Sequence, residues 1–228
     1  MEQIEKTSEK VIEYVELRIL AGKLKVDDRL PAERELAQML GVSRTAVREG
    51  IRLLEVMGIV ESRQGSGNYI ARHFDLTLEQ VLTMMYALEE MSYEQIREFR
   101  YAVERQALVL AVQNADEESK KLLRKYLDGL LYGETEEEQS ESDRMLHRCL
   151  VQMSGNRLVI ANYLALNRII DRFIGDVRKK IRDQSDEDFA DFQQVHRKLA
   201  EAVIRGDLEA GKEALDEHFV YITRDIDT

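Results

Sequence analysis

The stretch from residue 30 to residue 70 constrains the fold more than any other, because two helical patterns and a glycine-rich turn follow one another there. Pro31, the only proline, has the fixed backbone φ angle that suits the first turn of a helix. Leu36 and Leu40 recur after it at helical spacing, and Gly41 is a residue type that readily ends a helix. These residues predict a short helix between Pro31 and Gly41.

A second helix is predicted directly after the first, beginning at Ser43, whose hydroxyl can cap the opening turn. Val47 and Ile51 give this helix an apolar face. Its opening turns carry three polar side chains: Arg44, Thr45 and Arg48. A short helix, a tight turn and a second helix with a basic beginning are typical of a helix-turn-helix motif.

In such motifs the first turns of the second helix enter the major groove of DNA, where an arginine pairs with the O6 and N7 atoms of guanine. We therefore expect Arg44 or Arg48 to read guanine and Thr45 to contact a base or a phosphate. Arg34 is expected to contact DNA from the preceding helix, and Ser43 belongs to the same predicted interface. Each arginine alone would be interpreted as a solvated surface residue, but their arrangement favours DNA contact.

The pattern then changes to two short runs rich in β-forming residues, on either side of a turn at residues 64–67. Gly65 and Gly67 allow the backbone of this turn to approach a phosphate or the floor of the minor groove, and Arg63 stands beside it. The alternative for both glycines is a plain structural turn. A hairpin at this position is the wing of a winged helix-turn-helix.

The segments LPAERELA, GVSRTAVRE and RQGSGNYI, preceded by a helix over residues 8–21, resemble the DNA-binding domain of the GntR family of bacterial repressors. The resemblance implies a short palindromic operator with a GT/AC core. It assigns the DNA contacts to five residues: Arg34, Arg44, Thr45, Arg48 and Gly65. One departure is Gly50, inside the second helix, where a better helix former is expected and where glycine costs about 0.5–1 kcal/mol.

The remainder of the chain shows only helical patterns, without a further proline or a convincing strand after Ala71. The predicted helices span residues 77–91, 92–114, 116–132, 135–154, 156–182, 186–205 and 207–225. The predicted fold class is therefore mainly α. It comprises a winged helix-turn-helix with a small β-hairpin over residues 1–71, a linker over residues 72–76, and an antiparallel all-helical bundle for ligand binding and dimerisation over residues 77–228.

Three of the four histidines fall on three separate predicted helices of the bundle: His147, His196 and His218. Asp143 precedes His147 by four residues, which places carboxylate and imidazole on one helix face. A bundle can bring two further imidazoles inward to meet them, giving a set of three histidines and one carboxylate. A lone histidine on a helix is more often a half-buried residue without a ligand. His73, the fourth histidine, is assigned no role.

The bundle resembles the FCD domain of the FadR subfamily, an all-helical ligand sensor, and this resemblance favours the metal interpretation. It implies a divalent metal at Asp143, His147, His196 and His218, with zinc preferred over nickel, iron or manganese. It also implies a small carboxylate effector bound by Arg100, in a segment like the Arg-x-x-x-Glu signature of the subfamily. A surface salt bridge from Arg100 to Glu104 is the alternative. Asn156 is interpreted as a helix cap and not as a ligand contact.

Charge and cysteine content limit the class of protein. The first 72 residues contain 12 Lys and Arg against 12 Asp and Glu, and the rest contains 21 against 32, so any attraction to DNA comes from local arginines. Cys149, the single cysteine, is expected to be a packed helix residue in a reducing compartment. No signal peptide is visible and no apolar run approaches the ~20 residues that cross a bilayer, which predicts a cytoplasmic protein without membrane partners.

These observations predict a homodimeric, ligand-responsive transcriptional repressor that binds double-stranded DNA and is controlled by a small organic acid. Two alternatives remain open, a regulator for which the metal itself is the signal and a metal-dependent enzyme. No HExxH, nucleophile elbow, P-loop or dinucleotide-binding glycine pattern supports an enzyme. An acyl thioester sensor is disfavoured by the complete set of Asp143 and three histidines, because the acyl-binding member of the subfamily has no metal.

Overall fold

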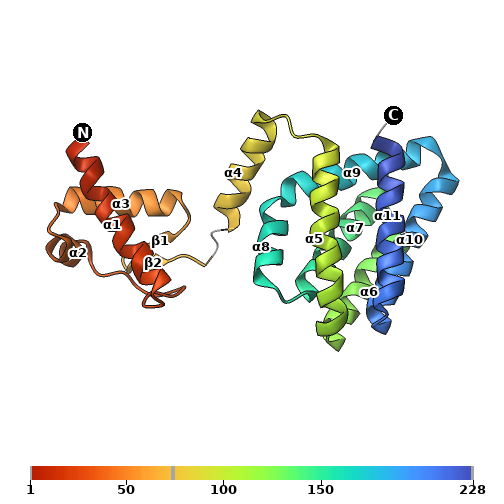
Figure 1. Cartoon of the computed structure of the whole chain (residues 1–228), viewed down its shortest axis with the longest axis horizontal. Coiled ribbons are helices and arrows are strands. Elements are labelled where there is room, and N and C mark those ends of the chain that lie inside the picture. Colours follow the sequence, from red (N-terminus) through yellow and green to blue (C-terminus); the bar gives the residue numbers. More distant parts are fainter. Residues whose placement is uncertain (1, 73–74, 227–228) are drawn as a thin grey trace. The chain divides into compact units, whose positions relative to one another are not determined.

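The structure is a computed structural model that describes residues 2–72 and 75–226, and it divides into two compact units, Met1–Gln80 and Val81–Thr228 (Figure 1). The first unit contains three helices and a hairpin: α1 (Glu2–Leu20), α2 (Glu33–Leu40), α3 (Arg44–Val56), β1 (Val60–Arg63) and β2 (Gly67–Ile70). The hairpin is antiparallel and pairs Val60 with Ile70 and Arg63 with Gly67. This is the predicted winged helix-turn-helix.

The turn between α2 and α3 follows the predicted signals closely. Gly41 ends α2 in the left-handed region at φ 64°, and Ser43 Oγ accepts a hydrogen bond of 3.1 Å from the Ala46 amide at the start of α3. The position of Pro31 differs from the prediction, because α2 begins at Glu33 and the proline lies before the helix instead of in its first turn.

The packing of α1 against α3 explains why residue 50 is a glycine, which the sequence alone did not reveal. A Cβ atom at this position would lie 2.7 Å from Val11 Cβ and 2.9 Å from the Ser8 carbonyl oxygen of α1. Val11, Val47 and Ile51 are buried in the same cluster, so α1 and α3 pack closely at Gly50. Glycine occupies position 50, despite its low helix propensity, because a larger residue would not fit the close contact between α1 and α3.

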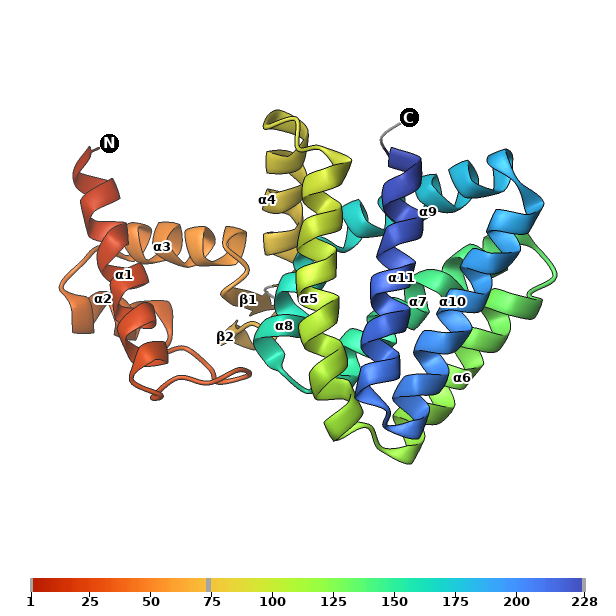
Figure 2. The ribbon, with the colours of Figure 1, turned by 45° about the vertical axis from the view of Figure 1, so that its right-hand side comes forward.

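The second unit is all helical, as predicted (Figures 1 and 2). Its helices are α4 (Asp75–Leu88), which spans the division between the units, α5 (Tyr93–Asn114), α6 (Glu117–Tyr132), α7 (Glu136–Met153), α8 (Arg157–Ala165), α9 (Asn167–Gln184), α10 (Asp186–Arg205) and α11 (Leu208–Ile226). α7 packs against α5, α6, α8 and α9, whereas α11 packs against α5, α9 and α10. The polar site described below lies where side chains of α5, α7, α9, α10 and α11 meet.

Two details of the predicted helices need correction. The single helix expected over residues 156–182 is two helices, α8 and α9, which meet at Leu166. No glycine or proline marks this break. It allows α8 to pack on α5 and α7 while α9 also reaches α10 and α11. The predicted linker, residues 72–76, overlaps α4 at its last two positions, and residues 73 and 74, including His73, lie outside the described residues.

Caps fix several helix ends in the bundle. The Asn156 side chain accepts hydrogen bonds from the amides of Leu158 and Val159 at the start of α8, which confirms the predicted cap. Cys149 is buried in the hydrophobic core on α7, as predicted, and burial raises the pKa of its thiol to about 11. Among the described residues, no helix combines the length and the apolar character that a membrane crossing requires.

Candidate metal centre and nucleic-acid interface

Three histidines from three helices meet in the interior of the second unit. His147 on α7, His196 on α10 and His218 on α11 are each at most 1% exposed, and one ring nitrogen of each lies within 4.8 Å of the others. The Nε2 atoms of His196 and His218 are 3.1 Å apart. The structure thus brings together all three of the histidines that the sequence singled out.

Asp143 completes the cluster from the helical turn before His147. Its Oδ1 atom lies 3.4 Å from Nε2 of His147 and 3.4 Å from Nε2 of His196, and the side chain is 1% exposed. Since the i, i+4 spacing on α7 places Asp143 and His147 on one face, α10 and α11 have only to supply the other two rings. Asp143 therefore lies beside two of the three clustered histidines, and all four predicted ligand residues are buried.

Two of the histidine rings are oriented by hydrogen bonds at their outer nitrogens. Nδ1 of His147 lies 2.7 Å from Oε2 of Glu104, and Nδ1 of His196 lies 2.9 Å from the carbonyl oxygen of Phe192. A carboxylate and a carbonyl accept hydrogen bonds, so these contacts place the ring protons outward and leave Nε2 facing the centre. His147 Nε2 is buried and has no hydrogen-bond partner among the described residues. A buried nitrogen of this kind fits a metal ligand.

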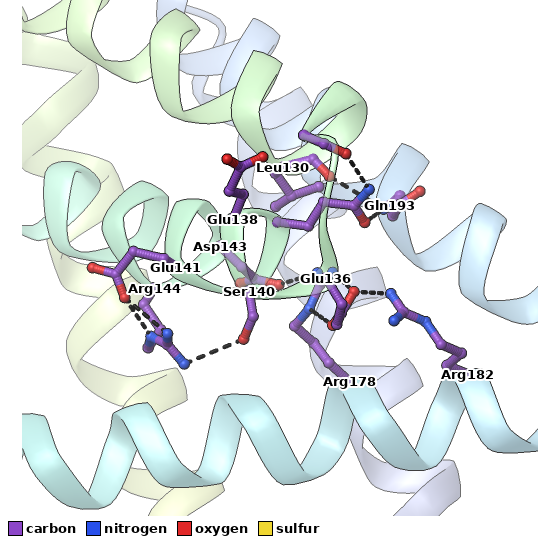
Figure 3. A network of polar contacts seen from close by, with 12 residues as sticks. Leu130, Glu136, Glu138, Ser140, Glu141, Asp143, Arg144, Arg178, Arg182 and Gln193 are labelled. Carbon is purple, nitrogen blue, oxygen red and sulfur yellow. Dashed lines mark hydrogen bonds and ion pairs between the residues drawn. The ribbon is translucent and has the colours of Figure 1, made fainter.

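A buried arginine holds the other oxygen of the aspartate. Arg178 on α9 donates from Nη1 to Oδ2 of Asp143 at 2.8 Å, and from Nε to Oε1 of Glu136 at 3.2 Å. Figure 3 shows Arg178 between these two carboxylates, with Arg182 reaching Glu136 from the other side. Because Arg178 engages Oδ2, Asp143 presents Oδ1 to the histidines.

Arg100 forms the ion pair with Glu104 that was the alternative to a ligand contact, but the pair is buried and not at the surface. Arg100 Nε donates to Glu104 Oε1 at 2.6 Å, and the two side chains are 1% and 0% exposed. Arg100 Nη2 is buried without a hydrogen-bond partner among the described residues. Glu104 therefore connects Arg100 to His147, a role that the sequence analysis did not assign to it.

The surrounding charges favour ionised carboxylates and a neutral His218, whereas at His147 burial is outweighed by Glu104, which raises the pKa of that ring. Burial alone would raise the pKa of Glu104, but Arg100 and His147 outweigh it and lower the pKa to about 2. Burial likewise opposes ionisation of Asp143, yet His196, His147 and Arg178 hold its pKa well below the usual value. Burial, with the nearby His196 and His147, lowers the pKa of His218 well below its usual value, which favours the neutral ring. Ionised carboxylates and neutral imidazoles bind divalent metals.

A small cavity adjoins the cluster. Its volume is about 10 Å³, which is room for about one water molecule. It is lined by Arg100, Asp143, Ile174, Val177, Arg178, Phe192, His218 and Ile222. Both buried arginines therefore border the space beside Asp143 and His218.

The predicted DNA-contact residues of the helix-turn-helix lie at the surface. Arg34, Ser43, Arg44, Thr45 and Arg48 are all exposed, and none points into the core of the first unit. Glu33 at the start of α2 accepts a hydrogen bond of 2.7 Å from Arg48 Nε and lies 3.9 Å from Arg44 Nη2. The recognition arginines are thus loosely tied to one carboxylate.

The wing presents Gly65 at its exposed tip, with φ at 72°. Arg63 beside it is engaged within the protein, because its Nη2 atom lies 2.9 Å from Asp27 Oδ1 and 2.6 Å from Glu61 Oε1. Its guanidinium also covers the Tyr69 ring, 4.3 Å from the centroid. Arg63 has fewer groups to offer to DNA than its position in the sequence suggested.

Comparisons with known proteins cover both units. A family profile described as "Bacterial regulatory proteins, gntR family" matches residues 7–70, and one described as "FCD domain" matches residues 95–221. The chain is 26% identical over 218 residues to the uncharacterized HTH-type transcriptional regulator YcbG of Bacillus subtilis 168, covering 94% of this chain and 88% of that protein. It is 26% identical over 168 residues to the Glc operon transcriptional activator of Escherichia coli K12, covering 71% and 66%. The solved Streptococcus agalactiae GntR shares the fold, with a TM-score of 0.68, 22% identity, and coverage of 97% and 99%.

Proposed function

The chain belongs to the gntR family of bacterial regulatory proteins and carries an FCD domain, and from this premise we propose that a divalent metal and a small carboxylate bound in that domain control its affinity for DNA. It is a DNA-binding transcriptional regulator and not an enzyme, since the family consists of regulators. The metalloenzyme alternative is therefore set aside.

The observation that carries the proposal is the convergence of three buried histidines beside Asp143, with the outer atoms of three of these four side chains already held by hydrogen bonds. Asp143, His147, His196 and His218 would bind the metal, with zinc as the first choice and nickel, iron or manganese as alternatives. Arg178, Glu104 and the Phe192 carbonyl orient three of these four ligands. When bound, the metal would supply open coordination positions to a carboxylate oxygen.

Arg100 supports the effector part of the proposal. Its Nη2 atom is buried without a partner at the edge of the cavity beside Asp143 and His218, and a carboxylate there would satisfy it. Because the cavity has room for about one water, the neighbouring side chains would move to admit even a small acid. Such a movement would give the effector different affinities for two states of the protein, as ligand control requires.

We propose that the DNA interface consists of Arg34, Ser43, Arg44, Thr45 and Arg48, with Arg63 and Gly65 at the wing. One winged helix reads only a few base pairs, so a homodimer on a short palindrome with a GT/AC core would raise both affinity and specificity. We propose that the dimer acts as a cytoplasmic repressor that releases its operator when the effector binds.

The metal site is tested with the full-length protein and Zn²⁺. We expect His196→Ala to lower zinc affinity by more than about 100-fold, the upper range for loss of a residue that only orients a ligand. Gln193→Ala on the same helix is the matched control, since Gln193 bonds to Leu130 and Gln139 and not to the cluster. Equal zinc affinities in both variants would refute the site.

The DNA interface is tested with a duplex that the wild-type protein selects from a randomised library. Arg48→Ala should lower affinity for this duplex by about 5- to 150-fold, as expected when a base contact is lost. Arg52→Ala, an exposed arginine four residues further along α3, should retain affinity. Unchanged binding by the Arg48 variant at the same salt concentration would refute its assignment.

A second function, direct metal sensing, is favoured by one observation, the small size of the cavity. In that case the metal itself would be the signal and no organic effector would exist. Dialysis against a mild chelator separates the two. A metal that is retained is a constitutive cofactor, whereas a metal that leaves readily and whose loss changes DNA affinity is the effector.

A further inference from the structure

The segment before α2 pairs with the wing along β2. The Leu30 amide donates to the Asn68 carbonyl at 2.8 Å, and the Ile70 amide donates to the Asp28 carbonyl at 2.9 Å. Arg29 and Tyr69 form an antiparallel β-bridge between these bonds. The backbone of Arg29 is therefore fixed to the wing as firmly as a strand residue.

The side chain of Arg29 passes close to Gly67. A Cβ atom at Gly67 would lie 3.1 Å from Nε and 3.2 Å from Nη2 of Arg29, and the φ angle of Gly67 is 118°. A side chain at residue 67 would displace the guanidinium and would also strain the backbone. Gly67 thus leaves the space in which the Arg29 guanidinium lies, a role that the turn pattern alone did not indicate.

Arg29 differs from the two other arginines near the wing in its partners. Arg63 bonds to Asp27 and Glu61, and Arg72 bonds to Asp27. Arg29 is exposed and has no hydrogen bond or ion pair within the part of the chain that the structure describes. Its guanidinium lies beside Gly67 but is not neutralised by a carboxylate.

Arg29 also lines a groove on the predicted DNA-binding side of the first unit. A groove of about 440 Å³ runs between the start of α2 and the wing, and Arg29, Glu33 and Gly65 all contribute to its lining. Glu33 is the residue that holds Arg48 and approaches Arg44. The groove therefore extends from the wing to Glu33, the residue that contacts Arg48 of the proposed recognition helix.

We propose that Arg29 is a DNA phosphate contact of the wing and that Gly67 is required to seat it. The contact rests on the DNA-binding face proposed above and adds a residue to it. Pairing with β2 fixes the backbone of Arg29, and its guanidinium donates in the fork geometry that phosphate oxygens accept. Arg63 also lines the groove, but its guanidinium contacts Asp27 and Glu61 and would have to leave them to reach a phosphate.

The test measures affinity of the full-length protein for the selected duplex and for a random-sequence duplex over a range of salt concentrations. Arg29→Gln should weaken binding to both duplexes by about tenfold, because a phosphate contact carries no sequence information. It should also lower the slope of log affinity against log salt by about 0.9. Arg72→Gln is the matched control, since Arg72 is exposed, bonds to Asp27 and does not line the groove, and it should leave the slope unchanged.

Arg29→Lys keeps the charge and should restore most of the slope, which separates loss of a cation from damage to the wing. Gly67→Ala should weaken binding in the wild-type background and have little further effect when combined with Arg29→Gln. An unchanged slope in Arg29→Gln, or an equal loss in Arg72→Gln, would overturn the proposal. Loss of binding in Arg48→Ala beside such a result would show that the recognition helix still binds DNA and that only the role of Arg29 was wrong.

Discussion

The two units differ in where they keep their charges. Among the described residues, all the buried charged side chains lie in the second unit. The only buried polar side chain of the first unit is that of Ser8. The ion pairs of the first unit lie at its surface, where Arg48 is 65% exposed and its partner Glu33 is 30% exposed. In the second unit, Arg100, Glu104 and Arg178 are at most 1% exposed.

This difference agrees with what we propose that each unit binds. Exposed arginines can exchange a carboxylate for a DNA phosphate at low cost, because water stabilises the intermediate arrangements. Buried charges lose hydration, so each must keep a partner, and the partners fix the geometry of the group between them. A network of buried charges is suited to hold a small ligand in one geometry. A set of exposed charges is suited to bind a long polyanion such as DNA.

Among the tests of this contrast, the substitution Arg178→Met has the largest expected effect. Removing the arginine leaves Asp143 and Glu136 without their shared partner, and breaking a buried ion pair costs about 3–5 kcal/mol. We expect a loss of that size in the free energy of unfolding of the metal-free protein, measured by chemical denaturation. Zinc should restore part of it, since a cation at Asp143 replaces the lost positive charge.

Arg182→Met is the matched control, because Arg182 pairs with the same Glu136 but is 33% exposed. A partly exposed pair contributes at most about 1 kcal/mol. Equal losses in the two variants would show that burial does not set the strength of these pairs, and the contrast between the units would then fail.

The second test is Glu104→Gln, which removes the charge that orients His147. Loss of such an orienting partner lowers metal affinity by about 10- to 100-fold. Zinc competition against a chelator of known affinity measures the change. Glu98→Gln, an exposed acid on the same helix, should leave zinc affinity unaltered.

The sequence predicted the ligands of this site better than their supports. Asp143 and His147 are joined by helical spacing, which is visible in the chain. Glu104 and Arg178 reach the cluster only because α5 and α9 pack against α7, and no local pattern records that packing. Arg100 and Glu104 show the same limit, since their spacing indicated an ion pair but not its burial.

The fold, like the site, was predicted where the signals are local in the sequence and missed where they depend on packing between distant helices. The order of α1, α2, α3 and the hairpin followed from caps and turn residues, which act locally. The break between α8 and α9 did not, because it has no glycine or proline and depends on which helices each half contacts. Gly50 was interpreted as a weakness of α3 because its neighbour on α1 is distant in sequence.

Gly50→Ala compares helix propensity with packing. Alanine is the better helix former by about 1 kcal/mol, but its methyl group would overlap Val11 and the Ser8 carbonyl, and overpacking costs about 1–3 kcal/mol. We expect the first unit to be destabilised, measured by hydrogen exchange of α1 and α3 amides. Gly175→Ala on α9, where no atom lies within 4 Å of the new methyl group, should instead stabilise its unit by about 0.5–1 kcal/mol.

The smallest expected effect comes from Glu33→Gln. The substitution releases Arg48 and Arg44 from their shared carboxylate and removes a negative charge from the groove that faces DNA. Exposed pairs of this kind contribute at most about 1 kcal/mol, so affinity for a random-sequence duplex should rise by up to about fivefold. Glu13→Gln on α1 changes the net charge equally and should have a smaller effect.

A fall in affinity for the selected duplex in Glu33→Gln would point the other way. It would mean that Glu33 orients Arg48 for base contact, as Glu104 orients His147 in the buried cluster. The exposed arginines would then be as dependent on fixed partners as the buried ones. Because the two outcomes have opposite signs, even this small effect decides whether exposure alone separates the two units.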